Sequence, residues 1–274
     1  MLTVNTNIGA MNALQYLNQT NEELGMVQNR INTGLVVAGA KDDGAVFAIA
    51  QNMRGNVAGY RAVSQSLDRA ISTVEVAIAA GEAISDLLIE MKEKALAAAD
   101  ASLDAASRNA LNEDFKALRD QIATIVNNAE FNNYNLVNNS TTAITALASA
   151  DGSKKITVLD ENLKLSASIV TVKTTSTIST QAKASTMIGT IETTLKNVNA
   201  ALGRLAAGVK KFEVQGQFVQ KLSDSMQAGI GNLVDADMAV ESAKLQALQV
   251  KQQLGVQALA IANSAPQVIL ALFR

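Results

Sequence analysis

Residues 188–219 read IGTIETTLKNVNAALGRLAAGVKKFEVQGQFV and form the most regular stretch of the sequence. Their apolar residues alternate spacings of three and four, which predicts one helix with a seam of the coiled-coil type. Ser185 is expected to cap the start of this helix, and Gly229, Gly231 and the acidic Asp235 and Asp237 are expected to mark its end. The seam consists of Ile188, Ile191, Leu195, Val198, Leu202, Leu205, Val209, Phe212, Gly216 and Val219.

A second seam occupies residues 44–99 and predicts another long helix. A break at 100–104 then precedes a shorter amphipathic helix with the same alternation of spacings. Together the three helices predict a long, coiled-coil-like helical bundle over residues 45–228. The seam residues are Met53, Tyr60, Leu67, Val74, Gly81, Leu88 and Ala95, then Val63, Ala70, Ala77, Ile84 and Met91, and in the shorter helix Leu111, Phe115, Leu118, Ile122 and Ile125.

A small β insert is expected within the bundle at about 130–182. Seven Asn residues within 127–139 end the preceding helix, because Asn side chains compete for the hydrogen bonds of the backbone. The Thr-, Ser-, Val- and Ile-rich segment that follows predicts a β-hairpin, with strands at 155–159 and 166–172 and a turn at Asp151-Gly152.

The two ends of the chain predict a pair of weakly charged helices, residues 1–33 and 235–274. The first contains only three charged residues, and after Lys251 no charge occurs until Arg274. Contiguous apolar surface marks interaction sites, so we expect self-association through this pair; the alternative is that both helices complete a monomeric bundle. The apolar positions are Ile8, Met11, Leu14, Leu17, Leu24, Val27, Ile31, Leu245, Leu248, Leu254, Leu259, Ile261 and Ile269.

Linkers are expected at 34–44 and 229–234, and the two breaks would lie together if the terminal helices pair. No apolar run near the C-terminus approaches the roughly 20 residues that cross a bilayer, and no helix has the Lys/Arg-rich face of a membrane-surface helix. We therefore expect no membrane insertion. The first basic residue is Arg30, so we expect no cleaved secretory signal peptide.

The composition argues against most enzyme classes. The 274 residues include no His and no Cys, which removes Ser-His-Asp and Cys-His catalysis, zinc sites built on these residues, and haem or iron–sulfur ligation. The net charge is −2 with 18% charged residues, which gives no electrostatic footprint for nucleic acid. We expect no enzyme, no catalytic residues, no cofactor, no metal site and no nucleic-acid partner.

Both ends of the chain resemble the terminal signatures of bacterial flagellins. The resemblance covers residues 1–137 and 185–274, in the family's order and orientation, while LVVA at 35–38 departs from the commoner Arg-Ile-Asn-Ser of the family. At the C-terminal end the matching residues are DADMAVE (235–241), Leu245, Gln249, Gln252 and LAIANSAPQVIL (259–270). At the N-terminal end they are VNTNI (4–8), NAL (12–14) and AKDDGAVFAI (40–49).

The resemblance implies a subunit that is exported and polymerises into the bacterial flagellar filament for motility, outside the cell. The paired terminal helices would form the inner core of the filament, and the bundle would lie outside it. Because only a short segment separates the matching halves, the chain resembles a core-only flagellin without large outer domains. The implied partners are copies of itself, sister flagellins, an export chaperone, the export apparatus, and hook-associated and cap proteins. The alternative is a hook–filament junction protein, also called hook-associated.

Two pairs of acidic residues flank the expected linkers: Asp42 with Asp43, and Asp235 with Asp237. Paired carboxylates can perform acid–base or metal chemistry, but acidic side chains also stabilise helix N-termini. We expect the structural role, at the junction that the flagellin resemblance calls the spoke.

One stretch of the long helix departs from the flagellin pattern. Flagellins that activate the toll-like flagellin receptor commonly carry Gln-Arg-x-Arg-Glu-Leu, and the aligned residues here are Ile89, Glu90, Met91, Lys92, Glu93 and Lys94. Glu90 reverses the charge of the first arginine, and Lys94 replaces an apolar residue. The resemblance therefore predicts a poor agonist of that receptor.

The segment 166–186 contains 11 Ser and Thr residues among 21. A polar surface of strands and turns is one explanation. O-glycosylation is the other, because several flagellins that resemble this chain are modified on outward-facing Ser and Thr. The candidates are Thr171, Thr174, Thr175, Ser176, Thr177, Ser179 and Thr180.

Overall fold

The computed structural model describes residues 6–272, and from residue 265 onward it describes the backbone only. The fold is mainly α with one β-hairpin, as expected. Two compact units divide the chain: one comprises 1–55 with 225–274 and the other 56–224. The elements are α1 (Ile8–Thr33), α2 (Gly44–Ala98), α3 (Ala105–Asn128), β1 (Ala143–Leu147), β2 (Lys155–Leu159), α4 (Gln181–Val234) and α5 (Met238–Leu272).

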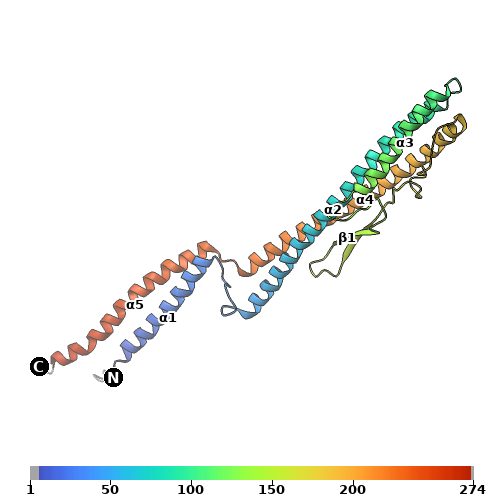
Figure 1. Ribbon diagram of the computed structural model, residues 1–274. Helices are drawn as coiled ribbons and strands as arrows, with labels where there is room; N and C mark the ends of the chain where they lie inside the picture. The colour runs from blue at the N-terminus through green and yellow to red at the C-terminus, as the bar shows by residue number, and fades with distance from the viewer. Residues whose placement is uncertain (1–5, 273–274) are drawn as a thin grey trace. The chain divides into compact units, whose positions relative to one another are not determined.

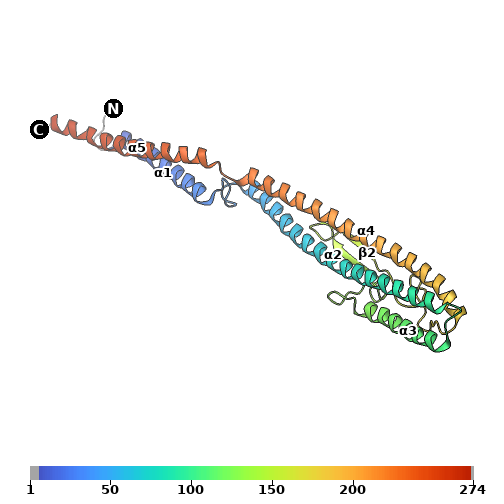
Figure 2. The same ribbon diagram turned by 90° about the horizontal axis from the view of Figure 1, so that it is seen from above.

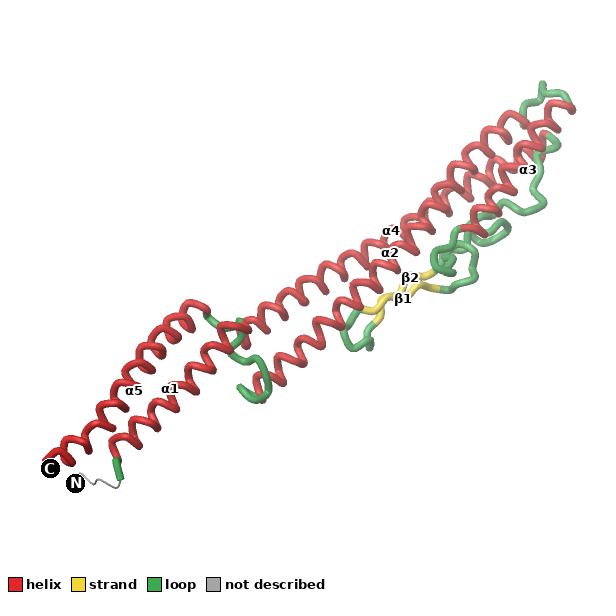
Figure 3. Tube along the Cα trace, turned by 60° about the vertical axis from the view of Figure 1, so that its left-hand side comes forward, coloured by secondary structure: helices red, strands yellow, loops and turns green. Residues whose placement is uncertain are grey.

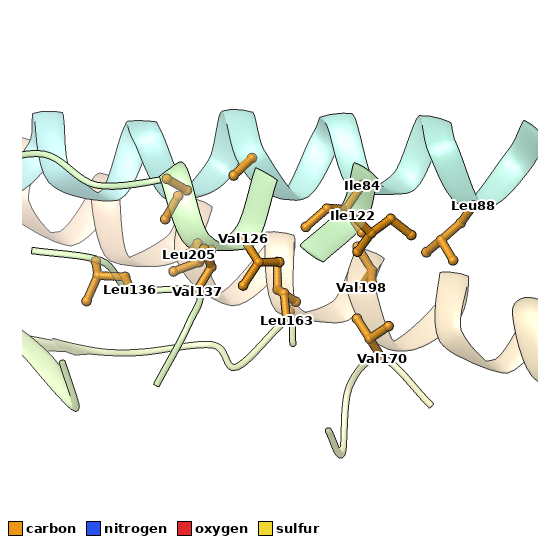
Figure 4. Close-up of a cluster of buried hydrophobic side chains, with 14 of the residues drawn as sticks. Ile84, Leu88, Ile122, Val126, Leu136, Val137, Leu163, Val170, Val198 and Leu205 are labelled. Atoms are coloured by element: carbon orange, nitrogen blue, oxygen red, sulfur yellow. The ribbon is translucent and has the colours of Figure 1, made fainter. Parts of the chain in front are cut away.

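The bundle unit is built on α2, α3 and α4, whose apolar seams meet in one core. Figure 2 shows α3 lying alongside α2, and Figure 4 shows side chains of all three helices converging on shared space. The predicted seams are confirmed at these positions, because the three-and-four spacing keeps the residues on one helix face. Fully buried seam residues include Leu67, Ile84, Leu88, Met91, Phe115, Ile122, Ile191, Val198, Leu205 and Phe212.

The predicted break between α2 and α3 is confirmed, and one side chain holds it in shape. Arg108 donates from Nε to the carbonyl of Ala98 at 2.9 Å, and from its NH2 group to the carbonyls of Asp100 and Leu103 at 2.9 and 3.0 Å. These carbonyls belong to the end of α2 and the turn after it, where the helix leaves its last acceptors without donors. Asp104 then caps α3 by accepting from the Ser107 amide.

The Asn-rich segment ends α3, as expected, and the buried side chain of Asn135 connects the end of this helix to the segment that follows it. This side chain is 2% exposed. Its Nδ2 donates to the carbonyl of Val126 at 2.8 Å, and its Oδ1 accepts from the amides of Val137 and Asn138 at 2.9 and 3.0 Å. Asn132 and Asn133 have positive φ, a conformation that Asn tolerates better than most residues. The cluster explains why Asn, rather than Gly or Pro, stops this helix.

The β-hairpin is present, but one predicted strand is wrong. β1 and β2 pair antiparallel, from Ala143 opposite Leu159 to Leu147 opposite Lys155, and the turn at Asp151-Gly152 is confirmed by a left-handed Gly152 with φ 71°. The run at 166–172 is a loop. The Ser166 amide donates to the Val172 carbonyl and closes this loop. Val170 and Val172 are both buried, so the loop has the alternating buried positions that are typical of a strand.

The predicted start of α4 is wrong, and its predicted end is right at Asp235 and Asp237 but wrong at the two glycines. The helix begins at Gln181, because Thr180, not Ser185, accepts the Lys183 amide on its side chain and the Ala184 amide on its carbonyl. It continues to Val234, so 229–234 is helical and the connection to α5 spans only 235–237.

The glycines near the end of α4 allow close approach instead of stopping the helix. A Cβ on Gly229 would lie 3.0 Å from Met53 Cε, and one on Gly231 would lie 2.7 Å from Asp235 Oδ2. Small residues at these two positions therefore leave room for neighbouring side chains.

The unit that contains both chain ends is organised around α1 and α5, which lie antiparallel and side by side (Figures 1 and 3). Asn7 caps α1 through Oδ1 and donates from Nδ2 to the carbonyl of Ala262 on α5 at 2.7 Å. Gln252 donates to Asn21 at 2.7 Å. The two helices approach closely at Gly255, where a Cβ would lie 3.2 Å from Leu17 Cδ1.

The two expected breaks meet in the same unit. Leu35 and Asp235 form an antiparallel bridge, the Val36 amide donates to the Val234 carbonyl at 2.7 Å, and the Ala236 amide donates to the Gly34 carbonyl at 2.8 Å. This arrangement confirms that the linkers lie together.

Candidate functional site

The α1–α5 pair exposes an unusual amount of apolar surface. Buried side chains in it are few, and large apolar residues face solvent along both helices, where a monomeric protein would normally expose only scattered ones. Ile261 is 71% exposed. The other exposed residues are Ile8, Met11, Leu14, Tyr16, Met26, Met238, Val240, Val250, Leu254 and Val256.

The apolar positions predicted for self-association divide into three groups. Val27 and Leu248 are only 6% and 7% exposed, because they already pack between the helices. Ile8, Met11, Leu14, Leu254 and Ile261 are exposed, and Leu17, Leu24, Ile31, Leu245 and Leu259 are half-buried. Ile269 lies beyond the residues whose side chains are described.

A buried carboxylate lies between α1 and α5, and it was not among the site residues predicted from the sequence. Glu241, in the first turn of α5, is 3% exposed. Its Oε1 lies 2.7 Å from Lys244 Nζ and 3.6 Å from the NH1 of Arg30 on α1. Its Oε2 is buried without a hydrogen-bond partner among the described residues. The signal that could have indicated this cluster is the i, i+3 spacing of Glu241 and Lys244, combined with the scarcity of other charges.

Three of the four acidic residues at the predicted junction accept hydrogen bonds from backbone amides: Asp42, Asp43 and Asp237. Asp43 caps α2 by accepting from Ala45 and Val46, and Asp237 caps α5 by accepting from Ala239 and Val240. A carboxylate at this position satisfies free amides and interacts favourably with the helix dipole.

The other two aspartates differ from each other. Asp42 Oδ2 accepts from the amides of Ala38 and Gly39, both at 3.0 Å, and so closes the loop before α2. Asp235 takes part through its backbone, in the bridge to Leu35. All four are therefore placed where chain direction changes, and none gathers with other acidic groups into a metal-binding cluster among residues 6–264.

The receptor-like stretch lies on α2 and is partly engaged within the bundle. Lys92 pairs with Glu192 of α4 at 2.8 Å, and Lys94 pairs with Asp114 of α3 at 3.0 Å. The hydrogen bond that Lys94 donates to the Asp114 carboxylate raises the pKa of Lys94. Ile89, Glu90 and Glu93 are exposed. The structure therefore presents an acidic residue, not a cation, at position 90.

The candidate glycosylation residues differ in exposure. Thr171 is half-buried and its hydroxyl lies 2.8 Å from that of Thr194. Ser176 and Thr180 accept backbone amides, and Ser179 and Thr177 are half-buried. Exposed side chains without such bonds among the described residues belong to Thr174 and Thr175.

Within the described residues, no helix combines the length and the apolar character needed to cross a membrane.

Comparison with known proteins identifies both halves of the chain. Residues 4–142 match the bacterial flagellin N-terminal helical region, and residues 188–273 match the bacterial flagellin C-terminal helical region. Flagellin FljK of Caulobacter vibrioides is 53% identical over 272 residues, which are 99% of this chain and 98% of that protein.

Two solved structures share the fold at low sequence identity. The crystal structure of Bacillus cereus flagellin is 20% identical with a TM-score of 0.51, covering 56% of this chain and 88% of that one. A structure described as a flagellar hook-associated protein of Vibrio parahaemolyticus is 12% identical with a TM-score of 0.60, covering 71% and 100%. At such identities only the fold is shared, whereas the two family regions and the near-complete alignment with FljK carry the assignment. The chain therefore belongs to the bacterial flagellins, the subunits of the flagellar filament.

Proposed function

We infer that the α1–α5 pair is the surface through which this flagellin polymerises, and that it forms the inner core of the filament. The observation that carries this inference is the row of exposed apolar side chains on both helices. Each buried square ångström of apolar surface is worth about 25 cal/mol, so copies that cover one another's terminal pairs gain stability that the monomer lacks. The bundle unit, with its core already buried, would form the outer layer.

Seeded elongation of purified monomer tests the inference. Ile261→Asp places a charge on the terminal pair at a residue that is 71% exposed in the monomer, so the monomer should fold while elongation fails. Leu159→Asp is the matched control, because Leu159 on β2 is 68% exposed but belongs to the bundle unit. Elongation of Ile261→Asp at the wild-type critical concentration would contradict the proposed surface.

A deletion of residues 266–274 tests the same surface at its C-terminal end. The truncated chain should elongate poorly while the circular-dichroism melt of the bundle stays unchanged. Loss of the bundle transition would instead mean that the terminal pair is part of the monomer's own folded core.

The likeness to flagellins supports further partners and a location. We infer that the chain is exported to the flagellum outside the cell with the help of an export chaperone and the export apparatus. Hook-associated and cap proteins would contact the two ends of the filament, and sister flagellins could share it. The hook-associated alternative is supported by likeness of fold alone.

Two surface features of the bundle belong to the same proposal. We infer that Thr174 and Thr175, exposed in the loop before α4, are the first candidates for O-glycosylation. An intact mass of the native protein equal to the unmodified 28.7 kDa would contradict it.

The stretch from Ile89 to Lys94 is inferred to be a weak receptor epitope, because Glu90 is exposed and carries the opposite charge to the family's arginine.

A further inference from the structure

The α1–α5 pair carries a groove with a positively charged rim. The groove has a volume of about 320 Å³, and Val27, Ala247 and Leu248 contribute apolar lining. Its cationic side chains are those of Arg30, Lys244 and Lys251. The first two already engage the buried Glu241, whereas Lys251 has no ion pair among the described residues. With Glu23 and Glu241 counted against these three cations, the groove has a net charge of +1. We call it the cationic groove.

A different face of α1 carries the complementary chemistry. Met11, Leu14, Gln15, Asn18 and Glu22 line a second hollow on this helix, of about 560 Å³, together with further amide side chains. Met11 and Leu14 are exposed apolar residues. Glu22 is exposed and has no ion pair among the described residues, so this surface has a net charge of −1. We call it the amide face.

We propose that the amide face of one subunit docks into the cationic groove of the next, with Glu22 of one copy beside Lys251 of the other. The proposal rests on the polymerisation inferred above and names the surfaces that meet. Amide and carboxylate oxygens accept hydrogen bonds, and Arg and Lys side chains supply only donors. Complementary charges fix the register in which two surfaces meet.

The proposal also accounts for open-ended growth. A contact between two different patches is heterologous, and it produces a filament when its rotation does not close a ring. Each subunit carries one groove and one face, so every subunit that joins offers a fresh groove or face to the next. A contact between two like patches would stop at a dimer.

Charge reversal in separate subunits provides the test. Glu22→Lys leaves a subunit with a positive face and a positive groove, and Lys251→Glu leaves one with a negative face and a negative groove. Each variant alone should raise the critical concentration for seeded elongation about 10-fold, because like charges then meet at every contact. An equimolar mixture of the two should elongate within about 3-fold of wild type, because opposite charges meet again when they alternate.

The mixture distinguishes contacts between chains from contacts within a chain. If residues 22 and 251 interacted within one chain, each variant would keep its like charges and mixing the two would restore nothing. Glu22→Lys mixed with Ile261→Asp, which also fails alone but keeps the charge at both position 22 and position 251, is the control and should not recover. Elongation of the single variants at the wild-type concentration, or failure of the mixture to recover, would overturn the pairing. Failure of wild-type monomer to elongate at all would overturn the proposed function instead.

Because the chain has no cysteine, a disulfide gives a second readout. Filaments of the Glu22→Cys, Lys251→Cys double variant should yield a ladder of dimers, trimers and longer oligomers after oxidation. Each single cysteine variant should stay monomeric on the same gel. A double variant without a ladder, or a ladder from either single variant, would overturn the head-to-tail contact.

Discussion

Arg204 on α4 binds both carboxylate oxygens of Glu161: Nε lies 2.6 Å from Oε1, and NH2 lies 2.6 Å from Oε2. Glu161 follows β2 and is buried, whereas more than half of the Arg204 side chain is exposed. Such a paired, charge-assisted contact has a fixed geometry that a lysine cannot reproduce. It fastens the segment after the hairpin to α4.

Arg204→Ala should lower the free energy of unfolding of the bundle by about 1–3 kcal/mol, because it leaves the buried Glu161 carboxylate without its donors. Urea denaturation followed by circular dichroism measures the change. Lys210→Ala is the control, since it breaks only an exposed pair with Glu213 and should cost less than about 1 kcal/mol. Equal losses in the two variants would contradict the role given to Arg204.

Leu67→Asp should unfold the bundle or destabilise it by at least about 3 kcal/mol, because a carboxylate would be buried without a partner in the seam of α2. Leu67 is 1% exposed. Thr175→Ala, in the exposed loop before α4, should leave the thermal melt unchanged. Similar melts for both variants would refute the assignment of the helix faces.

Two glycines on α4 should respond to alanine in opposite directions. A Cβ on Gly208 would lie 2.8 and 2.9 Å from the two methyl carbons of Val158 on β2, whereas a Cβ on Gly203 would meet nothing within 4 Å. Gly208→Ala should destabilise the bundle by about 1–3 kcal/mol through overpacking. Gly203→Ala should stabilise it by up to about 1 kcal/mol, because alanine favours the helix. Thermal melts with the same sign for both variants would contradict this packing of the hairpin.

The Asp151 carboxyl should titrate at about pH 2. Hydrogen bonds from the side chain of Ser149, then from Ser153, lower the pKa of Asp151 from 3.8 to about 2. Since the folded pKa lies below the unfolded one, the stabilisation is present above about pH 4 and is lost as the pH falls through about 2. Carboxyl chemical shifts against pH would measure it, and Ser149→Ala should move the midpoint upward. A midpoint near 3.8 in the wild-type protein would contradict the turn geometry.

The toll-like flagellin receptor should respond weakly to this protein even as pure monomer. A misplaced charge in a desolvated contact costs about 2–5 kcal/mol, so half-maximal activation of reporter cells should need at least about 30-fold more protein than a flagellin with the intact motif. Glu90→Arg combined with Lys94→Leu should raise the activity. Lys94→Leu alone removes the pair with Asp114 and controls for its loss. Activation equal to that of the intact motif would contradict the prediction.

The helical part of the fold could be predicted because its signal is periodic. Residues such as Leu67, Ile84 and Val198 recur every three or four positions over long stretches, and only one helix face satisfies all of them. The closeness of the two linkers also followed, since pairing of the terminal helices requires it. The pair itself could be expected from how little charge the ends of the chain carry.

The predictions failed where the surrounding structure, whether near or distant in the sequence, overrides the preference of a residue type. Gly229 and Gly231 have the composition of a helix end, but neighbouring side chains use the space that they leave. Ser185 is a good cap by type, yet Thr180 occupies the capping position five residues earlier. The loop at 166–172 carries strand-like alternation because Val170 and Val172 are both fully buried in the bundle core. Sequence alone also does not place Glu241, which is buried beside Arg30, more than 200 residues away.

The hydrogen bond from Asn7 to the carbonyl of Ala262 joins residues 255 positions apart, and this separation predicts an order of folding. Closing a flexible loop of that length costs about 5 kcal/mol of chain entropy, more than a few contacts between two helices return. This entropy cost falls sharply once Gly34 and Ala236 are hydrogen bonded. Each further pair between α1 and α5 then closes a loop only a few residues longer than the one already closed. We therefore expect the bundle to fold first and α1 and α5 then to pair from the Gly34 end outward, so that Asn7 and Ala262 are the last of these contacts to form and the first to separate.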